Sequence, residues 1–206
     1  MLTKGRVEAF SDGVLAVAIT LLVLDLHVDA GSRAASLAGQ LGERWPSFAA
    51  YVVSFFVIGV IWVNHHALFS LLAKVDRTLL FYNLLLLMFV TTIPFTTATL
   101  ADNLRGDTAD VRVAVLLYGA SMVGMSISFR SILHRMVHKN LLIHPVDRAT
   151  GRKAINRFGL GTVVYPLVVV VGLFAPVVML VLYAALTAFY MFEQTAILPA
   201  PTETDP

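Results

Sequence analysis

Long apolar runs alternate with short polar links along this chain. Each run is close to or above the roughly 20 residues that a helix needs to cross a bilayer. They predict membrane spans at about 10–28, 46–70, 78–101, 111–133, 154–173 and 176–194. The links leave no room for a soluble domain, and the polar, proline-containing tail 198–206 is expected to be disordered. We therefore predict an all-α integral membrane protein, with a single six-helix transmembrane domain over residues 1–197.

Composition supports this class and excludes several others. Hydrophobic residues make up 58% of the chain, against roughly 45–50% in soluble domains. Cysteine is absent, so disulfide and thiolate chemistry are excluded. The chain has no HExxH motif and no glycine-rich phosphate loop, and the order of its Ser, His and Asp residues does not suggest a catalytic triad. We therefore predict a protein that is not an enzyme, carries no cofactor or metal and does not bind nucleic acid.

The basic residues are distributed unequally between the two sides that six spans define. One side would hold eleven: Lys4, Arg6, Lys74, Arg77, Arg130, Arg135, Lys139, Arg148, Arg152, Lys153 and Arg157. The other side would hold four: Arg33, Arg44, Arg105 and Arg112. Because basic residues mark the cytoplasmic side, both termini are predicted to be cytoplasmic. A span count of five or seven would remove this asymmetry.

The segment 134–157 is the most basic link in the chain. Two interpretations remain open for it. It is either a determinant of topology, which is the commoner role of such a link, or a site for anionic lipid headgroups. His134 and His138 have a spacing that suits a metal, but no acidic ligand lies near them in the sequence.

The first span begins with a polar cluster and has two distinguishable faces. The cluster is Arg6, Glu8, Ser11 and Asp12. At about 100° per residue, one face collects Phe10, Gly13, Val14, Val17, Thr20, Leu21, Leu24 and Val28. The opposite face collects Leu15, Ile19, Leu22 and Leu26. The first face has the only mid-span hydroxyl and a glycine, which suit close helix contact or a surface that faces water. Hydrophobicity alone does not distinguish which face meets lipid.

Polar side chains are concentrated where the second span ends and the third begins. They are Trp62, Asn64, His65, His66 and, in the third span, Asn83. Polar groups at membrane depth are costly and usually face protein or water. Both helix ends lie on the side of the first span's polar cluster, so we predict one buried network joining Ser11 and Asp12 to a histidine and Asn83. Adjacent histidines point about 100° apart on a helix, which disfavours a shared metal ion.

Motifs in the first three expected spans resemble those of a known family. Arg6-x-x-x-Phe10-Ser11-Asp12-Gly13, followed by the apolar run to Leu24, is similar to the signature of the transmembrane protein 175 family of potassium channels. Trp62-x-x-His65-His66 and Asn83-Leu84 are also similar to that family's second and third spans. The resemblance covers about residues 4–100, and the single motif copy matches the bacterial six-span form.

The resemblance implies a potassium-permeable homotetramer in the bacterial plasma membrane, with the first helix lining a central pore. Carried onto this sequence, the family's aliphatic constriction falls on Val17, Leu21 and Leu24, and its hydroxyl layer on Thr20. The motif Arg6, Phe10, Ser11 and Asp12 would hold the cytoplasmic end of the helix. Val17 stands where the family commonly has isoleucine, which implies a wider closed ring.

The far end of the first span carries Asp25 and Asp29. A ring of these carboxylates would concentrate cations at a pore mouth, and ordinary interfacial solvation is the alternative. The chain lacks a TVGYG filter of the ordinary potassium-channel kind. A proton- or cation-coupled transporter that uses Asp12 and His65 is the alternative function, and it is disfavoured because paired broken helices are not evident. A membrane structural or lipid-binding protein is a third possibility.

Overall fold

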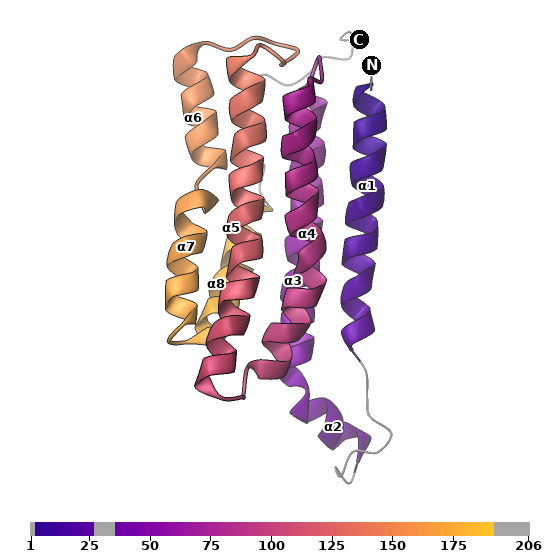
Figure 1. Cartoon of the computed structure of the whole chain (residues 1–206), viewed down its shortest axis with the longest axis vertical. Coiled ribbons are helices and arrows are strands. Elements are labelled where there is room, and N and C mark those ends of the chain that lie inside the picture. The colour runs from indigo at the N-terminus through magenta and orange to yellow at the C-terminus, as the bar shows by residue number, and fades with distance from the viewer. Residues whose placement is uncertain (1–2, 27–35, 192–206) are drawn as a thin grey trace.

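The computed structural model describes residues 3–26 and 36–191, and every named element within them is helical. The elements are α1 (Lys4–Leu21), the 3-10 helix η1 (Leu22–Asp25), α2 (Leu37–Glu43), α3 (Trp45–Ser70), α4 (Arg77–Asn103), α5 (Thr108–His138), α6 (Arg148–Phe158), α7 (Gly161–Gly172) and α8 (Pro176–Tyr190). The long helices run side by side, and α2 lies beyond one end of the bundle (Figure 1).

Five candidate membrane spans occur in the described residues. They are Lys4–Asp25, Trp45–Ser70, Arg77–Asn103, Thr108–His138 and Arg148–Gly172. The prediction of an all-helical membrane protein is confirmed by these spans. The helix α8 is apolar but shorter, with 15 residues, so the six-span count stays a prediction. Residues 192–194 of the sixth expected span, and the tail 198–206, lie outside the described residues.

The first helix begins earlier than the apolar run. It starts at Lys4, so the polar cluster Arg6–Asp12 lies within α1 rather than ahead of it. The helix then tightens into η1, which ends at Asp25. The helix therefore starts before the expected span at 10–28, because its polar first turns continue the helical hydrogen-bond pattern. Residues 27 and 28 of that span lie outside the described residues.

The region expected to form one span at 154–173 contains a break. The helix α6 ends at Phe158, and α7 begins at Gly161. The Tyr190 hydroxyl of α8 accepts a hydrogen bond from Gly161 N at 2.8 Å, so a side chain from another helix satisfies the start of α7. Apolar residues on both sides of Gly159 conceal this break in the sequence.

Glycines allow α5 to approach its neighbours closely. A Cβ atom at Gly124 would overlap the Phe89 ring of α4, and one at Gly119 would overlap Val169 of α7. A buried chain of hydroxyls also crosses the bundle: Thr97 donates to Ser54 at 2.8 Å, and Ser54 and Tyr118 share a hydrogen bond of 3.1 Å. Close packing and internal pairing of polar groups are what a bundle in lipid requires.

One end of the bundle is cross-linked by its loops. Leu72 and Leu142 form an antiparallel bridge, with Ala73 N donating to Leu141 O at 2.8 Å. The Arg135 guanidinium contacts the Asp76 carboxylate at 2.7 Å. At the same end, Lys4 Nζ donates to Ser70 O at 3.1 Å. The start of α1, the α3–α4 link and the α5–α6 loop are therefore fixed to one another at the end that carries the N-terminus (Figure 1).

Candidate functional site

One face of α1 packs against the bundle. Its buried residues are Val7, Ser11, Leu15 and Ala18, and Leu22 of η1 continues the row. They recur every three or four residues, which places them on one side of the helix. This side lies against α3 and α4. The face that carries Leu15 and Leu22 is therefore the one that anchors α1 within the chain.

The other face of α1 is open. Val17 is 57% exposed and Leu24 is 70% exposed, and Phe10, Thr20 and Leu21 are exposed as well. These include all four positions expected for the constriction and the hydroxyl layer. The helical wheel distinguished the two faces but could not orient them. Packing inside the chain orients them, and it leaves this face for lipid, water or another subunit.

Thr20 keeps its hydroxyl close to its own helix. The Thr20 Oγ1 atom lies 3.1 Å from Ala16 O and 2.9 Å from Val17 O. A hydroxyl that donates to a backbone carbonyl still has oxygen lone pairs free to accept. The exposed Thr20 oxygen can therefore interact with a cation on the open side of α1.

The far end of α1 contributes to an acidic groove. Leu24 and Asp25 line it from η1, and Phe95 and Asp102 line it from α4, around a volume of about 520 Å³. Asp25 is the carboxylate that the sequence predicts at this mouth, and Asp102 is a second one that it did not predict. Since the first and third spans are both expected to end on this side, their terminal carboxylates could have been paired from the topology. Asp29 lies outside the described residues.

A buried hydrogen-bond network holds the opposite end of α1. The Ser11 Oγ atom donates to Val7 O at 2.9 Å and accepts from Asn83 Nδ2 of α4 at 2.9 Å. The Asn83 Oδ1 atom lies 2.9 Å from His65 Nε2 of α3. Ser11 is 0%, His65 1% and Asn83 2% exposed, so three helices meet at a site without solvent.

The hydrogen bonds of the network determine which ring nitrogen of His65 carries a hydrogen. Because the Ser11 hydroxyl hydrogen goes to Val7 O, the Ser11 oxygen needs a donor, and the Asn83 amide must turn its nitrogen toward it. The Asn83 oxygen then faces His65 and can only accept, so Nε2 of His65 carries the hydrogen. The imidazole stacks on Phe69 with ring centroids 4.1 Å apart, which also fixes the ring plane.

Asp12 forms a separate contact. The Trp62 indole Nε1 donates to Asp12 Oδ1 at 3.0 Å, which ties α1 to α3 one position along from Ser11. His66 is exposed, and its ring lies 6.3 Å from the Trp62 ring. Arg6 and Phe10 are also exposed. The structure therefore brings the expected residues to one end of α1, but it divides them between a buried network and an exposed pair.

Replacing Asp12 by Ala is expected to lower the melting temperature of the purified protein. The Trp62 indole would lose a charged acceptor, and such a bond contributes about 1 kcal/mol when the pair is partly solvated. Asp12→Asn keeps an oxygen acceptor and is expected to retain most of the stability. A melting temperature for Asp12→Ala equal to that of the wild type would contradict an anchoring role for Asp12.

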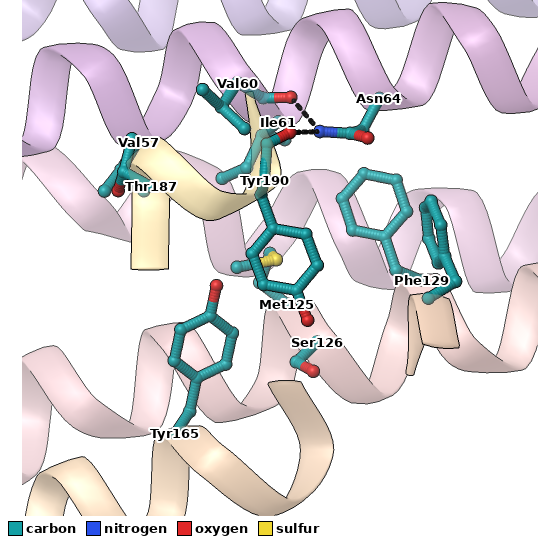
Figure 2. Close-up of a pocket in the computed structure, with 11 residues that line it drawn as sticks. Val57, Val60, Ile61, Asn64, Met125, Ser126, Phe129, Tyr165, Thr187 and Tyr190 are labelled. Carbon is teal, nitrogen blue, oxygen red and sulfur yellow. Dashed lines mark hydrogen bonds between the residues drawn. The ribbon is translucent and has the colours of Figure 1, made fainter. Parts of the chain in front are cut away.

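Asn64 lies outside this network. Its Nδ2 atom donates to Val60 O at 2.9 Å and to Tyr190 O of α8 at 3.0 Å (Figure 2). It borders a small cavity of about 50 Å³, toward which the Tyr165 side chain also points (Figure 2). The sequence places Asn64 among the polar side chains expected to support the network, but the structure turns it toward α8, because it lies on a different side of α3.

The polar residues do not form a metal centre. In the part of the chain that the structure describes, no group of three or more histidine, aspartate or glutamate side chains is placed to hold an ion. His65 hydrogen-bonds to Asn83, whereas Asp12 hydrogen-bonds to Trp62. The transporter alternative uses a polar network of Asp12 and His65, and in the structure these two side chains bond to different partners.

Comparison with known proteins assigns the family. A sequence model described as endosomal/lysosomal potassium channel TMEM175 matches residues 6–94, which include α1 from Arg6 onward, α3 and the first two-thirds of α4. A relative from Streptomyces collinus, named as a potassium channel, is 46% identical over 200 residues, which are 97% of this chain and 95% of the relative. The chain belongs to the TMEM175 family. The resemblance seen in the motif is thereby confirmed.

Further relatives extend the agreement to the structure. A potassium channel from Chamaesiphon minutus is 44% identical over 147 residues, which are 70% of this chain and 71% of that protein. The crystal structure of a lysosomal potassium-selective TMEM175 homologue from Chamaesiphon minutus superposes with a TM-score of 0.81 and 32% identity, over 93% of this chain and 97% of that one. These relatives are named as ion channels, not as enzymes. The chain is a membrane protein of an ion-channel family.

Proposed function

We propose that this chain forms a potassium-permeable cation channel, as a homotetramer with α1 facing a central pore. The observation that carries the proposal is the open face of α1, where Val17, Thr20 and Leu21 remain uncovered by the chain's own helices. One chain presents a single such face, so a closed pore requires several copies around an axis. The potassium-channel names of the Streptomyces collinus and Chamaesiphon minutus relatives support the choice of ion.

In this arrangement, aliphatic side chains form the barrier. Copies of Val17, Leu21 and Leu24 around the axis make stacked apolar rings. A ring narrower than a hydrated ion blocks conduction by dewetting and by the cost of removing the ion's water. Opening requires α1 to rotate or spread until the rings widen and Thr20 faces the ion. No separate carbonyl filter is needed for this mechanism.

The two ends of α1 have different roles in the proposal. The Ser11–Asn83–His65 network and the Asp12–Trp62 pair hold one end against α3 and α4. At the other end, Asp25 and Asp102 give the mouth a negative potential that raises the local cation concentration. The sequence assigns Asp29 to the same mouth, where a further carboxylate would add to this potential.

We assign the end that carries Lys4 and α6 to the cytoplasm. The protein would then lie in a bacterial plasma membrane with both termini on its cytoplasmic side. Lys74, Arg135 and Arg148 belong to the same end, and the positive-inside rule supports this orientation. The acidic groove at Asp25 would then face the outside of the cell.

The test is the reversal potential of purified protein in planar bilayers, with potassium on one side and sodium on the other. A channel of the proposed kind gives currents that reverse on the side that favours potassium. Currents that reverse at zero in the opposed gradients would contradict potassium preference. Transport without channel currents, measured as slow tracer uptake, would instead favour a carrier.

Thr20→Val is expected to lower the preference for potassium over sodium. The substitution keeps the shape of the side chain and removes its oxygen, so a dehydrated ion loses a ligand at this layer. The measurement is the reversal potential in the same opposed gradients. An unchanged reversal potential with a normal conductance would exclude Thr20 from selectivity.

A further inference from the structure

A basic groove lies between α5 and α6, away from α1. Its volume is about 750 Å³, within the range of roughly 300–1,000 Å³ typical of ligand sites. The residues that line it are Arg130, His134, Val137, His138, Asn140, Val146, Arg148, Arg152, Ile155 and Asn156. Three arginines and two histidines thus face one space, with no carboxylate among the lining residues.

The carboxylate nearest in sequence to the groove-lining arginines caps a helix. Asp147 caps the start of α6: its Oδ1 accepts from Ala149 N at 2.7 Å and from Thr150 N at 3.0 Å, and its Oδ2 accepts from the Thr150 hydroxyl at 2.6 Å. Asp76 is paired with Arg135, which does not line the groove. Neither of these carboxylates is among the residues that line the groove, so the lining side chains include three arginines and no acidic group.

The walls of the groove are held in place. A Cβ atom at Gly151 would overlap Val137, so α6 lies directly on α5. A Cβ atom at Gly159 would lie 2.8 Å from Nη1 of Arg130, which places the Arg130 side chain against the end of α6. The Leu72–Leu142 bridge fixes the α5–α6 loop at the other side. The arginines are thus presented by packed helices rather than by a loose loop.

The chain that follows the groove-lining helix α6 carries exposed apolar side chains. Leu160 follows the end of α6, and exposed apolar residues continue down α7 from it: Val163, Leu167 and Val170. Figure 1 shows α6 and α7 as consecutive segments, with α6 at the end that carries the N-terminus. The exposed apolar side chains of α7 would then lie next to a phosphate bound in the groove. They extend along the helix axis, which rises about 1.5 Å per residue.

We infer that the groove binds the phosphate of an anionic phospholipid, with an acyl chain along the outer face of α7. Arginine forks match phosphate oxygens, and a basic pocket at this level of the membrane attracts anionic headgroups. The site is independent of the proposed pore, because it involves neither α1 nor the buried network. It turns the most basic segment of the chain into a defined binding site.

The experiment measures lipid binding to the purified protein in detergent by native mass spectrometry. The probes are dioleoyl phosphatidylglycerol, dioleoyl phosphatidylcholine and inorganic phosphate. We expect wild-type protein to retain phosphatidylglycerol in preference to phosphatidylcholine. Arg148→Gln with Arg152→Gln is expected to weaken phosphatidylglycerol binding by about tenfold or more, since each basic residue near an anionic lipid contributes.

A matched control separates the groove from general charge. Lys139→Gln with Lys153→Gln removes the same charge from exposed positions at the same end that do not line the groove. This control is expected to bind phosphatidylglycerol as the wild type does. Equal losses in both double variants, or no loss in the arginine variant, would overturn the assignment.

Two further arms complete the test. Asn156→Glu places a carboxylate at an exposed groove position and is expected to weaken binding even if the arginine variant does not fold. Inorganic phosphate at the same concentration is expected not to displace the lipid, because it lacks the apolar contact with α7. Displacement by inorganic phosphate would show a site for free anions and would overturn the lipid assignment.

Discussion

Replacing Val17 by Asn is expected to increase the potassium current through the reconstituted channel by about tenfold or more, equivalent to lowering the barrier by about 1.4 kcal/mol. In the proposed tetramer, four Val17 side chains form an apolar ring that excludes water. Four amides at the same level would hydrogen-bond to water and keep the constriction wet. The open position of Val17, 57% exposed in the single chain, means that the substitution does not disturb packing within the subunit.

The measurement is macroscopic current in planar bilayers at equal amounts of incorporated protein. Val181→Asn provides the matched control: Val181 of α8 is 62% exposed, and α8 packs against α3 and α7. This control is expected to leave the current unchanged. A Val17→Asn protein that folds and incorporates but conducts no better than the wild type would exclude Val17 as the barrier.

Asn83→Leu is expected to destabilise the folded protein by about 1–3 kcal/mol, which is the cost of leaving a buried donor unpaired. Leucine has a similar volume but cannot accept the hydrogen on Nε2 of His65 or donate to Ser11. The imidazole would keep its buried polar group without a partner, since His65 is only 1% exposed. The melting temperature in lipid-free detergent measures this loss.

A double-mutant cycle makes the assignment specific. His65→Phe keeps a ring stacked on Phe69 and removes the unpaired donor, so Asn83→Leu with His65→Phe is expected to be more stable than the sum of the single losses. Asn156→Leu makes the same substitution at an exposed site on α6 and is expected to change the melting temperature little. Strictly additive losses at positions 83 and 65 would contradict the network.

Much of the site could be predicted from the sequence, because its polar residues stand out within apolar runs. Ser11, Asn83 and His65 are polar groups inside apolar runs, and polar groups in a membrane must find partners. The topology placed them at one end of the bundle. Which of them bond was not accessible, because adjacent positions on a helix differ by about 100° in direction. Because of these different directions around α3, His65 bonds to Asn83, Trp62 bonds to Asp12 and Asn64 bonds to Tyr190.

The sequence by itself determined that this is a helical membrane protein, because long apolar runs have few alternatives in lipid. It also determined the approximate spans and the chemistry of each face of the first helix. Only the tertiary structure decided which face of α1 is buried, where α6 ends and α7 begins, and how Arg130 and Arg148 come to share a groove. These outcomes depend on contacts between distant segments, and hydrophobic periodicity records only the local helix, not its neighbours.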